Sequence, residues 1–438
     1  MIANKSIFSE FNNPDTLGII SSFPIKGGEI ASMNAISRYT YLLSKSFPIN
    51  QNVVIFCERN KDSDRAYLLS KNILIIPSFK HDSVNFSGAL IANILKFNKV
   101  KDVLIQFEFS VFGGKKVIPS FLFLLFVLKL LNKFTSLVLH QVVTDLNDLS
   151  GHLGLSRNSL KVSLFNTLLT GFYLTIGSLS KNIIVHDKML KNRLSKFISK
   201  SKIDVIPHAV GDEKIIKLTS KLENVAKKSF GFGKKDKVIT VYGYRSWYKG
   251  TDWVVKTMNE LGKRYPEENL KLLVAGGASP TLKNTSAYKT FDKRLKGVIK
   301  KANGSVIVTG FIPERDVWKV FGASDVVVFP YRTRMSASGA FNLALTYKKP
   351  FLVSSHFSEG LDLTHKDLIF DLNTFSFEGK LLKMLKNQKF KSKVVSLSES
   401  AITNKSWTET ASLYLGLVKS DNILINVNFK KDFELVEA

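Results

Sequence analysis

Short apolar runs rich in β-branched residues alternate with helix-length segments along almost the whole chain, in two successive series. The runs carry few polar residues inside them, as strands do when a parallel sheet is covered on both faces. In the first series, the runs expected to be strands are Leu17–Ser21, Asn52–Phe56, Ile73–Ile76, Val103–Phe107, Ser136–His140, Asn182–His186 and Asp204–Ile206. The expected helices between them are Ile30–Ser44, Ser87–Phe97, Ile118–Lys133, Asn158–Ile176 and Lys188–Phe197. This βαβ series predicts a doubly wound α/β domain.

A polar segment from Glu213 to Asp236 separates the two series and is typical of a linker followed by an exposed helix. The expected strands of the second series are Lys237–Tyr242, Leu270–Ala275, Ser305–Thr309, Asp325–Phe329 and Phe351–Val353. Its expected helices are Thr251–Leu261, Ala287–Lys301, Glu314–Phe321, Ser338–Thr346 and Thr374–Leu385. The pattern therefore predicts two Rossmann-like doubly wound domains that face a cleft. We place them at 1–210 and 211–405, followed by a C-terminal helix and tail at 406–438.

The chain is strongly basic, with 63 Lys and Arg against 36 Asp and Glu in 438 residues, a formal net charge of +27. Such a balance favours an anionic partner: a nucleic acid, a lipid surface or a phosphorylated ligand. The sequence contains no helix-turn-helix, zinc spacing or aromatic RNA-binding strand, so we expect no nucleic acid partner. The single cysteine, Cys57, cannot form an internal disulfide and is expected to pack in the core.

We expect no helix that spans a membrane, because the most apolar windows are interrupted. Val117–Leu131 contains a proline and a lysine, and Val162–Ser180 is diluted by serine, threonine and asparagine. The segment Lys188–Lys200 is basic with an apolar side, which suits either peripheral contact with an anionic membrane or an ordinary surface helix. The apolar runs Phe121–Leu128 and Phe172–Leu174 suit a surface enzyme or a well-filled core. The expected location is the cytoplasm, with contact at the inner face of the membrane as a further hypothesis.

Ligands of doubly wound sheets bind where strands lead into helices, and three loops at such places carry suitable residues. The first holds Gly27 and Gly28, whose backbone can approach a ligand or form a plain turn. The second holds Arg245 and Lys249, cations suited to a diphosphate or simply solvated. In the third, the amides of Ser338, Gly339 and Ala340 could cradle phosphate oxygens, unless Ser338 is only a helix cap.

The order and spacing of these motifs resemble the family 4 glycosyltransferases, retaining enzymes with the two-domain GT-B fold. The stretches that carry the resemblance in the second half are Val241–Gly250, Leu273–Gly277, Val308–Pro313, Ala323–Tyr331, Ser338-Gly339 and Lys349-Pro350. In the first half they are Gly27-Gly28, Gln106–Glu108, Gly113-Gly114, Leu139-His140, Ile184–His186 and Val205–His208, and Ser406-Trp407 with Tyr414 resembles a helix that crosses back between domains.

The resemblance implies a nucleotide-diphosphate sugar as donor and a saccharide or polyprenyl-linked saccharide as acceptor. A hexose would move with retention, without a cofactor or a metal ion. It implies that Lys249 binds the diphosphate with the Ser338–Ala340 amides, and that Arg245 assists. The implied substrate contacts are Gly27, Gly28 and Glu108 on the acceptor side and the Phe311 backbone at the nucleobase. His140 would lie beside the transferred sugar, or else be a buried strand-end histidine.

Three positions depart from the family pattern. Tyr244 stands where many members have an arginine, so that Arg245 comes one place late, and Met335 and Leu343 stand where many members have glutamates. Asn342 is a candidate for the ribose contact in their place, although it could equally face solvent. The departure keeps an alternative open: a catalytically silent glycosyltransferase-like protein that binds sugar nucleotides. Asp62-Ser63-Asp64 has the spelling of a metal-binding motif, but it lies in a charged loop and is read as a solvated turn.

Overall fold

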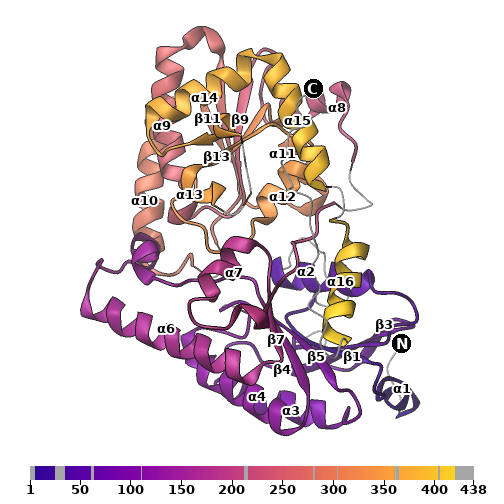
Figure 1. Cartoon of the computed structure of the whole chain (residues 1–438). Coiled ribbons are helices and arrows are strands. Elements are labelled where there is room, and N and C mark those ends of the chain that lie inside the picture. Colours follow the sequence, from indigo (N-terminus) through magenta and orange to yellow (C-terminus); the bar gives the residue numbers. More distant parts are fainter. Residues whose placement is uncertain are drawn as a thin grey trace.

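A computed structural model of the chain describes residues 5–24, 35–60, 64–109, 111–211, 216–279, 282–302, 304–359, 361, 365–402 and 405–419. These residues form two α/β domains, each built around its own sheet (Figure 1). The first sheet has the strand order β3-β4-β2-β1-β5-β6-β7-β8, and the second has the order β11-β10-β9-β12-β13-β14. Neighbouring strands run parallel throughout, except that β3 is antiparallel to β4.

The strands of the first sheet are β1 (Leu17–Ile20), β2 (Val53–Glu58), β3 (Tyr67–Ser70), β4 (Ile73–Phe79), β5 (Asp102–Phe107), β6 (Phe134–Leu139), β7 (Asn182–Val185) and β8 (Ile203–Val205). The helices of this half are α1 (Lys5–Phe11), α2 (Ala35–Lys45), α3 (Phe86–Leu95), α4 (Ile118–Leu130), α5 (Ser150–Leu153), α6 (Leu160–Leu179) and α7 (Lys188–Leu194). The 3₁₀ turns are η2 (Lys115–Val117), η3 (Leu146–Leu149) and η4 (Lys200–Lys202).

The strands of the second sheet are β9 (Lys237–Tyr242), β10 (Leu270–Ala275), β11 (Val306–Val308), β12 (Val326–Phe329), β13 (Phe351–Ser354) and β14 (Ile369–Phe370). Its helices are α8 (Ser220–Ser229), α9 (Thr251–Arg264), α10 (Ser286–Lys300), α11 (Val317–Ala323), α12 (Gly339–Thr346), α13 (Ser355–Ser358), α14 (Thr374–Lys386) and α15 (Gln388–Ile402). The 3₁₀ turns are η5 (Trp247–Lys249), η6 (Pro266–Glu268), η7 (Glu314–Asp316) and η8 (Lys366–Leu368).

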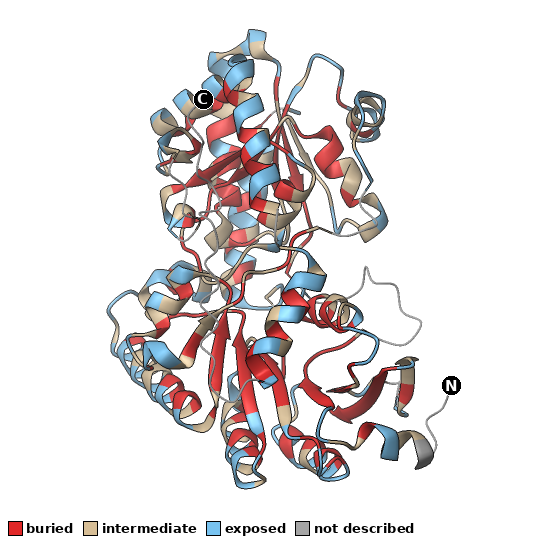
Figure 2. Ribbon diagram, turned by 45° about the vertical axis from the view of Figure 1, so that its right-hand side comes forward, coloured by how far each residue is buried: buried red, intermediate tan, exposed pale blue. Residues whose placement is uncertain are grey.

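Both faces of the first sheet are covered, because successive side chains of its strands point to opposite sides. Leu17 and Ile19 of β1 pack with α2 on one face, whereas Ile20 packs with α3, α4 and α6 on the other. The second sheet is likewise buried between helices, and the strands form the buried centre of each domain (Figure 2). The prediction of two covered parallel sheets is confirmed.

The last described helix, α16 (Trp407–Lys419), packs on the first sheet rather than the second. Its Ala411 and Tyr414 are fully buried beside α2, and the Tyr414 hydroxyl lies 3.0 Å from that of Tyr39. The chain therefore passes between the domains twice. The two crossings are hydrogen-bonded to each other, because the amide of Val210 donates to the carbonyl of Lys405 over 2.7 Å.

The basic helix ends at Leu194, earlier than expected, and its apolar Leu190 and Leu194 are buried in the core, as in the ordinary surface helix that the sequence left as an alternative. One expectation about the N-terminal domain needs correction. By length and composition, α6 is apolar enough to cross a membrane, contrary to the expectation that no segment would be. Only 28% of the most apolar window of α6 is buried inside the protein, so most of that window lies at the protein surface.

Candidate functional site

The loops that follow β9, β10 and β11 stack closely on one another through glycine backbone. Gly243 has φ +107°, and its amide donates to the carbonyl of Ala275 over 2.9 Å. A Cβ on Gly276 would lie 2.1 Å from the Gly243 oxygen, and a Cβ on Gly277 would lie 3.2 Å from the Phe311 amide nitrogen. Gly276 leaves no room for a side chain, because a Cβ there would overlap the Gly243 backbone, and Gly277 leaves little. The Phe311 backbone thus lies against Gly277, in the stack of loops where the nucleobase was expected.

Lys249 and the start of α12 meet over the same loop. A Cβ on Gly243 would lie 2.7 Å from Lys249 Nζ and 4.0 Å from the Cβ of Ala340. The two groups come from loops after β9 and β12, which are hydrogen-bonded neighbours in the sheet. Gly250 joins these loops, since its φ is +70° and a Cβ there would lie 1.9 Å from the Pro330 oxygen.

The Lys249 ammonium remains charged in this half-buried position. Burial lowers its pKa, but the phenolic groups of Tyr331 and Tyr248 oppose that effect and hold the pKa above its ordinary value. The Nζ atom also lies 5.9 Å from the centre of the Tyr331 ring, in cation–π contact. A fixed positive charge therefore stands beside the first turn of α12.

The first turn of α12 is built to receive an anion. Ser338 caps the helix, since its hydroxyl oxygen accepts from the Phe341 amide over 3.3 Å and lies 3.2 Å from the Tyr331 hydroxyl. Open space surrounds Gly339 where a side chain would stand. The first amides of a helix have no partner within it, and together with the helix dipole they favour negative charge. Within this turn, Ser338, Gly339 and Ala340 lie together as the sequence suggested.

Arg245 and Asn342 lie at the edges of this region. The Arg245 amide donates to the carbonyl of Gly277 over 2.9 Å, and its guanidinium lies close enough to Tyr288 of α10 to oppose the rise that burial causes in that phenol's pKa. The side-chain nitrogen of Asn342 is buried without a hydrogen-bond partner, so it does not face solvent. The Nε atom of Arg245 is likewise buried without a hydrogen-bond partner. Arg245 and Asn342 therefore each keep an N–H donor that a ligand could use.

The N-terminal domain closes the other side of the site through the end of β6. The amide of Val142 donates to the carbonyl of Met335 over 3.0 Å, and Gln141 forms a bridge with Ser336. Glu108, which follows β5, lies near Tyr248 of the second loop and contributes to raising that phenol's pKa, after burial and Tyr331. The predicted acceptor-side residue Glu108 thus faces the loop that carries Lys249. Gly27 and Gly28 lie outside the described residues.

His140 is held in a buried relay with a second histidine that the sequence did not single out. The Ile206 carbonyl can only accept, so His186 Nδ1, 3.0 Å away, carries a hydrogen. Burial lowers the His186 pKa to about 4, so its Nε2 is bare and accepts from His140 Nδ1 over 3.2 Å. His140 Nε2 lies 2.6 Å from Gln106 Oε1, and both atoms would then be acceptors. Rotating the Gln106 amide by 180° turns its NH₂ group, which has no other partner, toward the ring as the donor.

This relay places His140 in the buried, hydrogen-bonded setting that the sequence left as its alternative. Burial lowers the pKa of His140 well below its ordinary value, and the neighbouring His186 and His208 act in the same direction. The neutral ring lies at the end of β6, one residue from the contact with Ser336. Its role beside the transferred sugar stays a prediction.

Buried charges and one tryptophan hold the domains together around the site. Arg334 Nη2 donates to Asp187 Oδ2 over 2.8 Å, and both side chains are almost fully buried. A Cβ on Gly151 of α5 would lie 2.4 Å from the Trp247 ring, so the second loop is packed against the N-terminal domain. Sequence reasoning missed Asp187 and Arg334, although Asp187 also caps α7 by accepting from the Leu190 amide, a pattern the sequence does carry.

Comparison with known proteins agrees with this architecture. Residues 235–387 match the family model described as "Glycosyl transferases group 1". No curated protein sequence matches the chain. Among solved structures, sucrose-phosphate synthase from Thermosynechococcus elongatus superposes with a TM-score of 0.71 at 14% identity, covering 92% of this chain and 98% of that one.

Two further structures are similar over most of the chain. Anabaena Alr3699/HepE, solved with UDP and glucose, has a TM-score of 0.63 at 12% identity and covers 93% of this chain and 100% of that one. WaaG, a glycosyltransferase involved in lipopolysaccharide biosynthesis, has a TM-score of 0.60 at 12% identity, covering 92% and 99%. The fold is therefore GT-B: two Rossmann-like domains with parallel sheets.

Proposed function

We propose that the protein is a glycosyltransferase that moves a hexose from a nucleotide-diphosphate sugar to a saccharide or lipid-linked saccharide. The observation that carries the proposal is the placement of the Lys249 ammonium beside the first turn of α12, above a floor of glycine backbone. A diphosphate fits such a place, because a lysine and free helix amides both favour negative charge. The match of residues 235–387 to group 1 glycosyl transferases supports the same conclusion.

The chemistry that these groups can perform is electrostatic. As the bond between the anomeric carbon and the diphosphate breaks, negative charge grows on the leaving oxygen and positive charge on the sugar ring. Lys249 and the amides of Gly339 and Ala340 stabilise the leaving group, and they need no rearrangement because the fold already holds them in place. In other enzymes a metal ion can supply this positive charge. We propose that here Lys249 and the helix amides supply it and that transfer needs no metal.

Retention of configuration is also part of the proposal and follows from the family resemblance. In such a route the acceptor hydroxyl approaches on the face that the diphosphate leaves, and a departing phosphate oxygen takes its proton. The walls available to hold the acceptor are the N-terminal segments after β5 and β6, which carry Glu108 and His140. Holding both substrates in the right geometry supplies much of the rate.

The test is donor binding and turnover with Lys249→Ala, measured by calorimetry with UDP and GDP and by release of nucleoside diphosphate from their sugars. We expect the variant to bind at least about tenfold more weakly, since charge-assisted contacts are lost. Lys256→Ala is the matched control, because Lys256 lies on the neighbouring α9 with an exposed side chain that pairs only loosely with Glu260 at 3.9 Å. Equal binding by wild type and Lys249→Ala would refute the site.

The alternative of a silent sugar-nucleotide-binding protein rests on Met335 and Leu343, which lack the carboxylates expected there. The same experiment separates the two functions. Nucleotide binding that depends on Lys249, with no turnover of any donor across a panel of saccharide and glycolipid acceptors, would favour the silent protein.

A further inference from the structure

Helix α6 presents three different surfaces along its length. Its core row includes Phe172, Tyr173 and Ile176, which are buried in the N-terminal domain. Leu160, Leu164 and Leu168 recur every four residues and therefore share one face of the helix. Their exposed fractions are 91%, 59% and 59%. The third surface is polar and lines a hollow described below.

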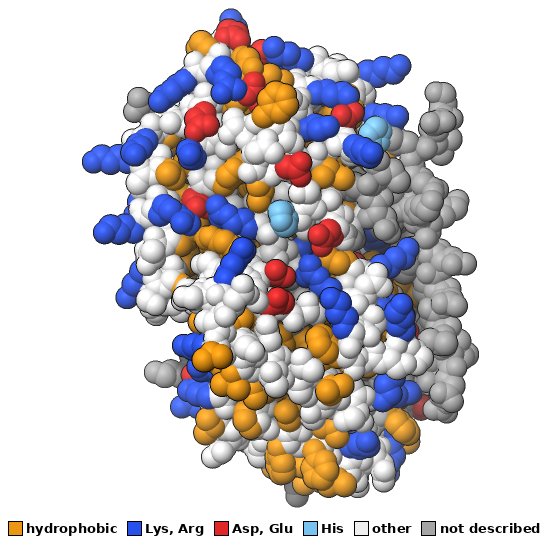
Figure 3. All heavy atoms as spheres, turned by 60° about the vertical axis from the view of Figure 1, so that its left-hand side comes forward, with side chains coloured by type: hydrophobic (Ala, Val, Ile, Leu, Met, Phe, Trp, Pro, Cys, Tyr) orange, Lys and Arg blue, Asp and Glu red, His pale blue; other side chains and the backbone are white. Residues whose placement is uncertain are grey.

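The neighbouring helix α4 carries exposed apolar side chains of its own. Phe123, Phe126 and Leu130 of α4 follow one another at helical spacing and are also exposed. The two helices pack together, since Phe121 of α4 contacts Phe172 of α6. Figure 3 shows hydrophobic side chains gathered over this lower domain on the face turned to the viewer. Exposed apolar patches of this kind mark surfaces that meet another apolar body.

The charged residues on helices α3, α4 and α6 indicate what kind of apolar partner this surface suits. The helices α3, α4 and α6 contain no Asp or Glu, whereas α4 carries Lys129 and α6 carries Lys161. Lys129 donates to the Ser178 carbonyl over 3.0 Å and so lies between the two helices, and Lys115 lies 5.6 Å from the Phe165 ring. Leucine and phenylalanine bordered by lysine, without carboxylates, is the chemistry that suits the surface of an anionic bilayer.

The packing of α6 inside the domain argues against its crossing a membrane. The Tyr173 hydroxyl accepts from the Val143 amide and donates to the Val143 carbonyl, each over 3.0 Å, inside the domain. Withdrawing α6 into a bilayer would break these buried hydrogen bonds and open the core. The helix therefore offers only its outer leucine row to the lipid.

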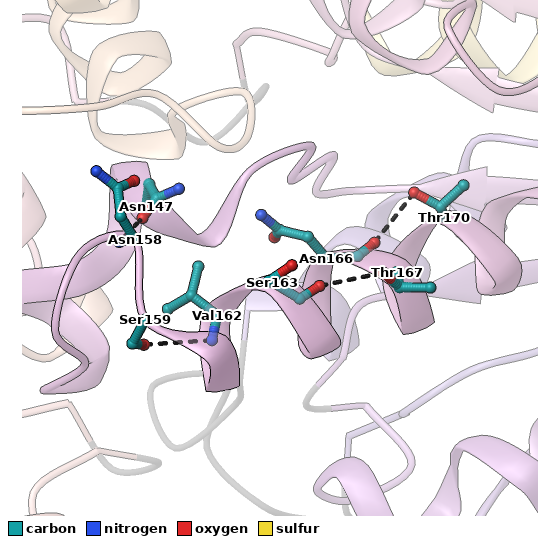
Figure 4. A pocket seen from close by; sticks show the side chains of 8 residues that line it. All are labelled: Asn147, Asn158, Ser159, Val162, Ser163, Asn166, Thr167 and Thr170. Carbon is teal, nitrogen blue, oxygen red and sulfur yellow. Dashed lines mark hydrogen bonds between the residues drawn. The ribbon is translucent and has the colours of Figure 1, made fainter.

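The polar row of α6 borders a hollow of about 390 Å³ (Figure 4). Its walls carry uncharged amides and hydroxyls from Asn147, Asn158, Ser163, Asn166 and Thr170. The Thr170 hydroxyl donates to the Asn166 carbonyl over 3.0 Å, which leaves its oxygen able to accept. Amide and hydroxyl groups without charge suit the hydroxyls of a neutral saccharide.

The hollow adjoins the candidate active site through α5. Asn147 in η3 precedes α5 directly, and Gly151 and His152 of α5 contact Trp247 and Tyr248 of the loop that carries Lys249. The hollow thus lies beside both the apolar outer row of α6 and the short helix α5, which contacts the loop that carries Lys249.

We propose that the α4–α6 face docks on an anionic membrane surface, and that the hollow on α6 receives the saccharide head group of a glycolipid held there. The second part rests on the proposed function, since it makes the glycolipid an acceptor. The first part does not, because docking requires no turnover.

Docking is tested by sedimentation with vesicles of phosphatidylcholine alone and of phosphatidylcholine mixed with phosphatidylglycerol. Wild type should sediment with the anionic vesicles, less so at high ionic strength, and Leu160→Ser/Leu164→Ser/Leu168→Ser should lower the bound fraction about tenfold or more. Ile49→Ser/Phe375→Ser, at residues that are 75% and 88% exposed elsewhere, is the control and should bind like wild type. Wild type left in the supernatant, or a dimer that only the leucine variant dissociates in ultracentrifugation, would overturn membrane docking.

The hollow is tested with neutral vesicles that contain a dihexosyl diacylglycerol. Ser163→Phe should fill the hollow and lower binding to these vesicles, while binding to phosphatidylglycerol vesicles and to UDP stays unchanged. Ser396→Phe on α15 is the control, because Ser396 is an exposed helical serine in the other domain. Equal glycolipid binding by Ser163→Phe and wild type, or no preference of wild type for the glycolipid, would remove the saccharide assignment and leave the UDP result intact.

Discussion

The Asp187 carboxylate lies 2.8 Å from Nη2 of Arg334 and joins the two domains through a buried ion pair. Arg193 of the same helix donates to the Arg334 backbone carbonyl, and the Arg334 guanidinium stacks 5.1 Å from the Phe357 ring. The loop that leads into α12 is therefore held from the side of the N-terminal domain. Any change to this contact acts on the stability of the protein and on the shape of the anion site together.

Asp187→Asn should destabilise the protein by about 3 kcal/mol, because it leaves Arg334 buried without its counter-charge. Urea unfolding measures this loss. Glu399→Gln provides the control, since Glu399 pairs with Lys348 at 2.6 Å but both side chains are about half exposed. That exposed pair should contribute less than about 1 kcal/mol. If the two variants lost similar free energies of unfolding, burial would not be what makes the Asp187–Arg334 pair matter more.

Stability should fall as the pH is lowered below about 6.5. Burial lowers the pKa of His186 to about 4 and that of His208 to about 3, so the folded protein resists protonation that the unfolded chain accepts. Between pH 6.5 and 4 the unfolded state binds more protons, and the free energy of unfolding should drop by up to about 1.4 kcal/mol per pH unit for each histidine. Urea midpoints across this range measure the slope, which should be shallower in His208→Asn. A flat profile in wild type would show that these rings are protonated in the folded state.

Gly250→Ala should weaken both the fold and donor binding. A Cβ at this position would lie 1.9 Å from the Pro330 oxygen, and its φ of +70° disfavours a side chain, so we expect a loss of about 2 kcal/mol or more. Gly262→Ala in the neighbouring helix α9 is the matched control, because open space surrounds Gly262 and alanine favours the helix by up to about 1 kcal/mol. Thermal unfolding and UDP titration of both variants test the pair. Tolerance of Gly250→Ala would mean that the two loops are not held together there.

Most of the fold could be predicted because its strands are continuous apolar runs, and such runs have few alternatives to a buried parallel sheet. The antiparallel edge strand β3 was missed because Tyr67–Ser70 is only four residues long, too short for a periodic pattern to stand out, and it is mostly half-buried. Helix α15 was missed although Phe390, Val394, Leu397 and Ala401 recur at helical spacing. The serines between these residues obscured that pattern in the sequence. In the helix, several of their hydroxyls donate to the carbonyls one turn earlier.

The site could be predicted best within the C-terminal domain. Lys249 and Ser338 follow strands β9 and β12, which are neighbours in the second sheet, and the family resemblance assigned both residues to the diphosphate. The pairing of Asp187 with Arg334 depends on how two separate sheets are oriented, and no local pattern encodes that orientation. Helix α6 shows the same limit of sequence analysis. Its polar residues dilute the apolar pattern in the sequence. The structure shows that one side of the helix packs in the core and that the polar residues line a hollow on another.

The position of α16 has a consequence for how the molecule can move and be shortened. Because Trp407 Nε1 donates to the Gly211 carbonyl over 3.0 Å, the outgoing and returning segments behave as one double-stranded strap. Two crossings tied to each other at this place oppose twisting of one domain against the other more than a single crossing would. The position of α16 also means that removing the end of the polypeptide damages its beginning, since Tyr414 and Ala411 would leave a hole beneath β1.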